Sequence, residues 1–168
     1  MAFVFELIFL KIAERLQKKL SGKAIFIMFG AKRDDKIFSE VLKFVKKRNY
    51  LANIYNNYFQ EVDIFQIPEV QKKSKHAFHI YPLLINFEKI NLTKNILFEK
   101  MLNYNIKLQV HYIPIHLQPY YKKYYGFKKG DFPIAEKFYD REITLPIHFS
   151  LKENQVYKIV KSMKKIIL

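Results

Sequence analysis

The chain contains no cysteine and little glycine, and both shortages exclude classes of site. Without cysteine neither a disulfide nor a cysteine-ligated zinc centre can form, and the chain suits a reducing compartment, so we expect a cytoplasmic protein. The four glycines are scattered, so neither a P-loop nor a dinucleotide-binding glycine motif can be built. No serine lies in a nucleophile-elbow motif. A complete enzyme active site is therefore not legible in these residues.

Arginine is also rare, which bears on the strong positive charge. The 168 residues carry a formal net charge of +15, from 30 Lys and Arg against 15 Asp and Glu. Four of the basic residues are arginine, the side chain that pairs bidentately with phosphate and guanine, and the lysines are spread along the chain. We therefore expect solvated lysines and no nucleic-acid partner. A basic nucleic-acid-binding protein is the least favoured of three hypotheses.

A long apolar run is missing as well. Residues 1–20 are hydrophobic, but Glu6 interrupts them, and a membrane-spanning helix needs about 20 apolar residues. No basic residue precedes the run and no small-residue cleavage site follows it, so we expect no signal peptide. We predict an amphipathic or buried helix over 1–20, a short apolar strand over 24–29 and no membrane partner. The charged stretch 30–35 is the predicted domain boundary, which leaves residues 1–35 as a separate N-terminal segment.

Residues 36–168 predict one α+β domain with a sheet of about three strands and flanking helices. Apolar residues at three- and four-residue spacing predict a long amphipathic helix from Lys36 to Phe59. Residues 76–87 are apolar in both alternation classes, as in a covered strand, and Pro82 predicts a bulge or a sheet edge there. The other predicted elements are helices over 94–104, 132–139 and 151–168, and strands over 106–112 and 142–147.

Local signals mark the ends of these elements. Thr93 can cap the helix over 94–104, whose apolar face is predicted to comprise Ile96, Leu97, Met101 and Leu102. Asn105 is the best non-glycine residue for a left-handed helix stop. Pro133 suits the first turn of the helix over 132–139. Ser150 and Glu153 form an S-x-x-E capping box for the last helix.

The stretch 106–121, which reads IKLQVHYIPIHLQPYY, is the most informative part of the chain. Its first seven residues alternate, so one face can pack on a core while Lys107, Gln109 and His111 form a polar face that can meet a ligand. Pro114 then ends regular pairing. The tyrosines of 120–125 could stack on bases or sugars, but we favour a partly buried aromatic wall under a loop.

The five histidines are candidate metal ligands. His76 and His79 point to opposite faces of a strand, and His111 and His116 stand on either side of a proline. No clear set of carboxylates or thiolates accompanies either pair. We therefore predict no metal site.

Four motifs resemble the C-terminal domain of the DegT/DnrJ/StrS sugar aminotransferases: HIYPLLI, LQVHYIPIHLQPYY, FPIAEKFY and EITLPIH. The resemblance covers about residues 36–168 and is nearest to the pseudaminic-acid-pathway branch of the family. It implies the small C-terminal domain of a fold-type I, pyridoxal-phosphate-dependent transaminase, which is a homodimer in the family. That branch transfers an amino group from glutamate to the 4-keto carbon of a UDP-linked 4-keto-6-deoxy-N-acetyl sugar. The resemblance further implies that Gln109, Val110, His111 and Tyr112 contact the substrate.

The resemblance also shows departures from the family. The large domain with its Schiff-base lysine is missing, residues 1–35 do not match the family, and no lysine lies in a matching cofactor motif. We therefore assign no catalytic or cofactor-binding residue and expect no pyridoxal phosphate on this chain alone. The favoured hypothesis is a fragment of a nucleotide-sugar aminotransferase that is inactive by itself. The alternative is a non-catalytic module that binds a sugar nucleotide or pairs with another subunit.

Overall fold

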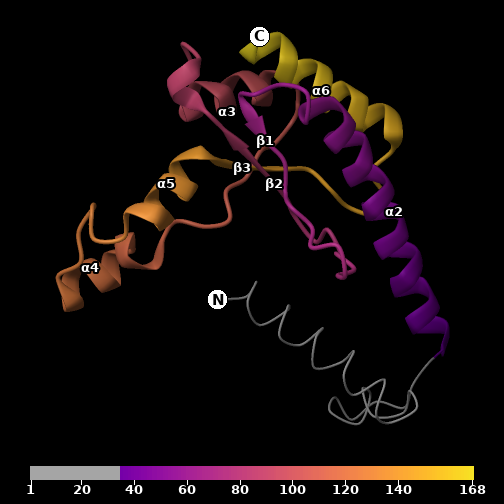
Figure 1. Ribbon diagram of the computed structural model, residues 1–168, viewed down its shortest axis with the longest axis horizontal. Coiled ribbons are helices and arrows are strands. Elements are labelled where there is room, and N and C mark those ends of the chain that lie inside the picture. The colour runs from indigo at the N-terminus through magenta and orange to yellow at the C-terminus, as the bar shows by residue number, and fades with distance from the viewer. Residues whose placement is uncertain (1–34) are drawn as a thin grey trace. The chain divides into compact units, whose positions relative to one another are not determined.

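The computed structural model describes residues 35–168 (Figure 1). The chain divides into two compact units, 1–43 and 44–168, and apart from the first residues of α2 the features below belong to the second. The predicted helix over 1–20 and strand over 24–29 lie outside the described residues. Among the described helices, none combines the length and the apolar character that a membrane crossing requires.

Helix α2 runs from Asp35 to Phe59, which confirms the predicted long helix. From residue 44 onward its inner face comprises Leu51, Ala52, Ile54, Tyr55 and Phe59, all of which are buried. Leu51, Ile54 and Tyr55 belong to the apolar stripe that predicted the helix, whereas Tyr58 of that stripe is 39% exposed. Tyr55 donates through its hydroxyl to the carbonyl of Pro146 at 2.8 Å.

The sheet contains β1 (Phe65–Gln66), β2 (Tyr81–Ile85) and β3 (Glu142–Leu145), in the order β1-β2-β3 and antiparallel throughout. This confirms an α+β domain with a three-stranded sheet. Pro82 faces Thr144 of β3, while β1 pairs only with Leu84 and Ile85. On the side of β2 that faces β1, no residue of β1 therefore pairs with Pro82. This fits the predicted sheet edge at that point.

The predicted strand over 106–112 was wrong. This segment makes one isolated bridge to β3, in which Gln109 and Thr144 exchange backbone hydrogen bonds of 3.2 and 2.7 Å. The ladder cannot extend because Pro146, which would face Lys107, has no N–H. On the other side, the His111 N–H donates to the side-chain carboxylate of Glu142 at 3.0 Å instead of to its backbone carbonyl. The third strand of the sheet is β1, for which no strand was predicted.

The predicted strand over 76–87 is shorter in the structure. Phe78 has φ 43°, and its N–H donates to Nδ1 of His76 at 3.0 Å, so the chain turns before β2 begins at Tyr81. After β2, the short 3-10 helix η2 (Phe87–Lys89) leads towards the next helix.

Helix α3 (Lys94–Asn103) has the predicted ends. The Thr93 hydroxyl accepts from the Ile96 N–H at 3.3 Å, and Asn105 takes the left-handed conformation with φ 58°. The predicted apolar face is only half correct. Leu97 and Met101 are fully buried, whereas Ile96 and Leu102 are exposed.

The last part of the chain contains the short 3-10 helix η3 and three helices: η3 (Ile115–Leu117), α4 (Pro119–Tyr125), α5 (Pro133–Arg141) and α6 (Glu153–Ile167). Pro133 opens α5 as predicted. The Ser150–Glu153 capping box was wrong, because Gln155 Oε1 accepts from the Lys152 N–H at 2.9 Å and caps α6 instead. The Glu153 carboxylate bonds the tyrosine hydroxyls of Tyr50 and Tyr157, at 2.7 and 2.6 Å.

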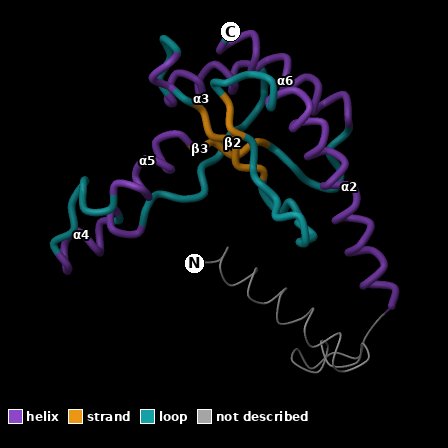
Figure 2. Tube along the Cα trace, viewed as in Figure 1, coloured by secondary structure: helices purple, strands orange, loops and turns teal. Residues whose placement is uncertain are grey.

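The core lies where the C-terminal part of α2, the sheet, α3 and α6 meet (Figure 2). Helix α6 contributes Val156, Ile159, Val160 and Met163, all of which are buried. Helix α4 lies apart from α3 and α6, and η3, α4 and α5 together are called the arm below.

Candidate functional site

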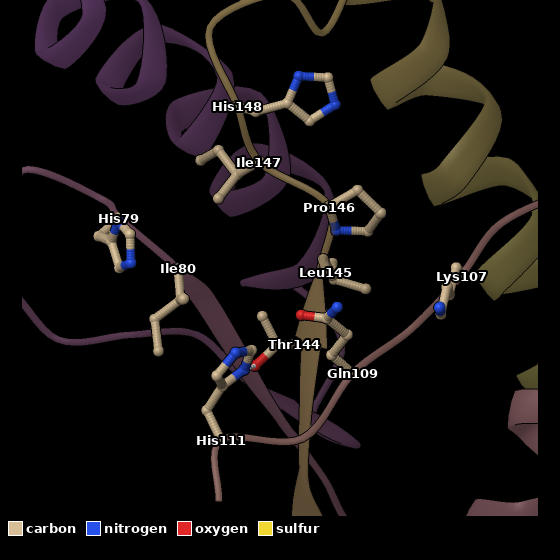
Figure 3. A pocket seen from close by; sticks show the side chains of 10 residues that line it. All are labelled: His79, Ile80, Lys107, Gln109, His111, Thr144, Leu145, Pro146, Ile147 and His148. Atoms are coloured by element: carbon tan, nitrogen blue, oxygen red, sulfur yellow. Dashed lines mark hydrogen bonds between the residues drawn. The ribbon is translucent and has the colours of Figure 1, made fainter. Parts of the chain in front are cut away.

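A cavity of about 250 Å³ opens beside the bridge between Gln109 and Thr144. Figure 3 shows Gln109, His111 and Thr144 near one end of it and His148 at the other. The cavity is lined by His79, Ile80, Lys107, Gln109, His111, Thr144, Leu145, Pro146, Ile147 and His148. The predicted polar face of 106–112 therefore forms part of its wall.

The four residues predicted to contact substrate divide between two places. Gln109 and His111 line this cavity, and Val110 between them is half-buried. Tyr112 is 69% exposed and lines a different, apolar cavity. No ligand contact of these residues is tested by the structure, so their role stays a prediction.

Sequence reasoning missed His79, Thr144 and His148. Thr144 and His148 lie within the motif EITLPIH, which by itself gives its members no role. Antiparallel pairing of β2 with β3, and the bridge from β3 to Gln109, bring these residues together. The spacing of residues within one segment cannot show that residues of separate segments come together.

Buried polar groups fix the orientation of His111. Its Nδ1 lies 2.8 Å from Thr144 Oγ1, and Thr144 Oγ1 in turn bonds Glu142 Oε1. Glu142 is 1% exposed and Thr144 is 6% exposed. The imidazole is thus held through Nδ1 by Thr144, which Glu142 holds in turn, and it lines the cavity.

The charge around the cavity suits an anion. Among the described residues that line it, Lys107 is the cation and none is a carboxylate. Three imidazoles and the Gln109 amide supply further hydrogen-bonding groups. A ligand with a phosphate and several hydroxyls would find a matching partner for each kind of group.

Lys94, in the first turn of α3, interacts electrostatically with the buried carboxylate of Glu142. Burial lowers the pKa of the Lys94 amine, and the charges of Glu142 and Asp140 act in the opposite direction. Its Nζ donates to the carbonyl of Tyr139 at 2.5 Å. Lys94 does not line the cavity, so its perturbed amine serves the packing of α3 on α5.

A second, apolar cavity of about 610 Å³ lies on the arm. It is lined by Tyr112, Pro114, Asp131, Phe132, Pro133, Ile134, Ala135 and Phe138, and is called the apolar groove below. Ile134 is 87% exposed at its rim. Exposed apolar side chains gathered around a hollow are typical of a surface that another polypeptide covers.

The arm is held by a buried pair between His116 of η3 and Glu136 of α5, 5% and 6% exposed. His116 Nε2 lies 2.7 Å from Glu136 Oε1. The same carboxylate accepts from the N–H groups of Gly130 and Phe132, at 2.9 and 3.3 Å. His116 is therefore committed to this pair. Among the described residues no group of three or more potential metal ligands occurs.

The tyrosines of 120–125 form helix α4, so the predicted aromatic wall under a loop was wrong. Tyr120, Tyr124 and Tyr125 are 59–63% exposed and lie ring against ring, with centroids 4.8 Å apart for Tyr120 and Tyr124. Pro119 opens the helix and Gly126, with φ 69°, ends it.

Comparisons with known proteins agree on one family. The family model for the DegT/DnrJ/EryC1/StrS aminotransferases matches residues 37–164. An uncharacterised protein of Methanocaldococcus jannaschii, MJ1066, is 43% identical over 122 residues, covering 73% of this chain and 32% of that protein. The UDP-4-amino-4,6-dideoxy-N-acetyl-beta-L-altrosamine transaminase of Campylobacter jejuni is 31% identical, over 72% of this chain and 33% of its own length.

Solved structures show the same likeness. PseC of Helicobacter pylori, an aminotransferase involved in the biosynthesis of pseudoaminic acid, superposes with a TM-score of 0.65 and 30% identity. The match covers 73% of this chain and 32% of PseC. The chain thus spans about a third of the length of the relatives that it matches.

Proposed function

The chain belongs to the DegT/DnrJ/EryC1/StrS aminotransferase family, and we propose that it is the substrate-side domain of a nucleotide-sugar aminotransferase. The observation that carries the proposal is the cavity at Gln109 and His111, which joins one lysine to uncharged hydrogen-bonding groups. A UDP-linked 4-keto-6-deoxy-N-acetyl sugar matches it, since its diphosphate is anionic and its sugar bears hydroxyl, carbonyl and amide groups. The amino group would come from glutamate.

The cofactor of the family is pyridoxal phosphate, which carries the amino group between donor and acceptor. Its binding requires a lysine for the Schiff base and an acidic or basic partner for the pyridine nitrogen. Among the described residues, Lys107 is the lysine at the cavity; it is exposed and has no carboxylate beside it there. The described residues therefore do not fit the cofactor, and we propose that this chain alone neither binds it nor transaminates.

Titration with UDP-N-acetylglucosamine tests the binding role. Because a net hydrogen bond contributes about 0.5–1.5 kcal/mol, His111→Ala should raise the dissociation constant by up to about tenfold in calorimetry. His76→Ala is the matched control, because His76 lies outside the cavity. An affinity that His111→Ala leaves unchanged would contradict the proposal.

The same preparation tests the lack of activity. With added pyridoxal phosphate and glutamate, the chain alone should show no Schiff-base absorbance and no amino transfer. A stable internal aldimine with turnover would show that the chain is competent by itself. We propose further, from the family, that the full-length enzyme is a cytoplasmic homodimer.

The apolar groove supports the alternative that the chain pairs with another subunit. Its lining is almost wholly apolar side chains, and Ile134 protrudes with 87% of its surface exposed. A separate chain carrying the cofactor domain would bury these side chains.

Ile134→Asp should abolish a complex with such a cofactor-domain chain, because a charge would be buried in the interface. Ile96→Asp is the control, since Ile96 lies on α3 outside the groove and is 41% exposed. Size-exclusion chromatography of the mixed chains measures the outcome. A complex that tolerates Ile134→Asp as well as Ile96→Asp would place the contact elsewhere.

A further inference from the structure

The Glu142 carboxylate, the Thr144 hydroxyl and the His111 imidazole form a chain of hydrogen bonds from β3 to the cavity, called the relay below. Glu142 Oε2 accepts from the His111 N–H at 3.0 Å, and Glu142 Oε1 bonds Thr144 Oγ1. Thr144 Oγ1 then lies 2.8 Å from His111 Nδ1. Within the described residues, no hydrogen bond of the other ring nitrogen, Nε2, to a protein atom is found. His111 therefore has one occupied nitrogen and one that is available at the cavity.

Counting protons assigns the hydrogen atoms in this relay. The Thr144 hydroxyl donates to Glu142 Oε1, so its single hydrogen points to that carboxylate. The hydroxyl oxygen can then only accept from the imidazole. The hydrogen of a neutral His111 must consequently lie on Nδ1, and Nε2 carries a free lone pair.

Two donors reach the carboxylate of Glu142. The Thr144 hydroxyl donates to Oε1, and the His111 backbone N–H donates to Oε2 at 3.0 Å.

We propose that Glu142 and Thr144 are positioning residues that hold neutral His111 as the Nδ1–H tautomer, so that Nε2 accepts a hydrogen bond from a hydroxyl or amide N–H of the ligand. Recognition of a sugar by this atom rests on the proposed function, whereas the tautomer itself does not. A phosphate oxygen has no hydrogen to give, so the donor to Nε2 is not the diphosphate, and comparison with UDP separates the sugar from the ribose and the uracil. Lys107 is left for the anionic part.

The tautomer can be read directly by long-range ¹H–¹⁵N correlation NMR of the full chain. At about pH 8.5, two units above the ordinary pKa of histidine, the neutral ring dominates. Wild type should show His111 as Nδ1–H. The Nε2–H form in wild type would overturn the proposal without any variant being needed, because it would mean that the proton order along the relay is reversed.

Variants of β3 test what sets the tautomer. Thr144→Val keeps the shape but removes the hydroxyl, and should turn the single Nδ1–H form into a mixture; Thr144→Ser should restore it. Glu142→Gln should shift His111 towards Nε2–H, because the glutamine amide can donate to the Thr144 hydroxyl, which then donates to Nδ1. An unchanged Nδ1–H form in Thr144→Val and Glu142→Gln would overturn the positioning role.

His148 is the internal control in the same spectra. Its Nδ1 lies 3.0 Å from the Ser150 hydroxyl, on the exposed end of the cavity and away from Glu142. Its tautomer should be the same in wild type and in every β3 variant. A matching shift at His148 would mean that the variants disturb the whole cavity, and this would count against a specific relay.

Binding separates this inference from the proposed function. Thr144→Val should weaken UDP-N-acetylglucosamine by up to about tenfold and leave UDP unchanged, because the lost interaction is with the sugar. An equal loss for both ligands would overturn the assignment of Nε2 to the sugar. If wild type shows the Nδ1–H form and binds neither ligand, the relay stands and the proposed function fails.

Discussion

Replacing Tyr81 with alanine should lower the free energy of unfolding by about 3–5 kcal/mol, the range for deleting a large buried aromatic ring. Tyr81 is fully buried at the start of β2, with its ring centroid 4.8 Å from that of Tyr55. Its hydroxyl donates to Asn56 Oδ1 at 2.6 Å, and burial raises the pKa of that hydroxyl, so the donor keeps its proton. Since a domain has about 5–15 kcal/mol of stability, the variant loses a large part of it.

Two further substitutions separate the causes in urea unfolding. Tyr81→Phe keeps the ring and removes only the hydrogen bond to Asn56, so it should cost about 1 kcal/mol. Tyr112→Ala removes a tyrosine that is 69% exposed and should change stability by no more than about 0.5 kcal/mol. Similar losses for Tyr81→Ala and Tyr112→Ala would show that the ring of Tyr81 does not hold β2 on α2.

Replacing Glu136 with glutamine should loosen the arm and change how stability depends on pH. Burial by itself raises the pKa of the Glu136 carboxyl, but the hydrogen bonds from His116 and from the N–H groups of Gly130 and Phe132 outweigh it, so the net pKa is lowered. A lowered folded-state pKa contributes stability that is complete above the unfolded-state pKa, about 4.3, and is lost as the pH falls through the folded-state value. Glu136→Gln lacks this contribution.

Unfolding curves between pH 3 and pH 7 measure the effect. Wild type should be more stable than Glu136→Gln at pH 7, and the two curves should converge as the pH falls from the unfolded-state value, about 4.3, through the lowered folded-state value. Hydrogen exchange of the Gly130 and Phe132 amides should be faster in the variant, on the order of tenfold. Glu99→Gln, on the exposed side of α3, is the control. A constant difference between wild type and Glu136→Gln at every pH would show that the carboxylate charge is not what holds the arm.

Local signals in the sequence predicted the elements that depend on neighbouring residues. The stripe of α2, the Thr93 cap and the left-handed Asn105 all lie within a few residues of the structure that they specify. The apolar face of α3 was only half predicted, because Leu102 is 61% exposed beside the fully buried Met101. Which apolar residue of a helix is covered depends on the neighbouring elements, and periodicity does not name them.

The strand predicted over 106–112 was wrong for a different reason. Alternation predicted one apolar face, of which Ile106 and Leu108 are buried but Tyr112 is 69% exposed. Alternation reports faces and not hydrogen-bond partners. The partner segment contains Pro146 and Glu142, which end the ladder on both sides of Gln109. Similarly, the polar face indicated Gln109 and His111, whereas the relay that orients His111 comes from residues more than thirty positions further along the chain.

The hydroxyl bonds from α2 to the C-terminal part of the chain have a consequence for synthesis on the ribosome. Tyr55 reaches the Pro146 carbonyl across 91 residues, and Tyr50 reaches Glu153 across 103. At about 5–20 residues per second, the polymerisation of those residues takes roughly 5–20 s, during which the inner face of α2 has emerged without its partners. The inner face of α2 in a nascent chain therefore stays uncovered until the segment around Pro146 to Glu153 has been made.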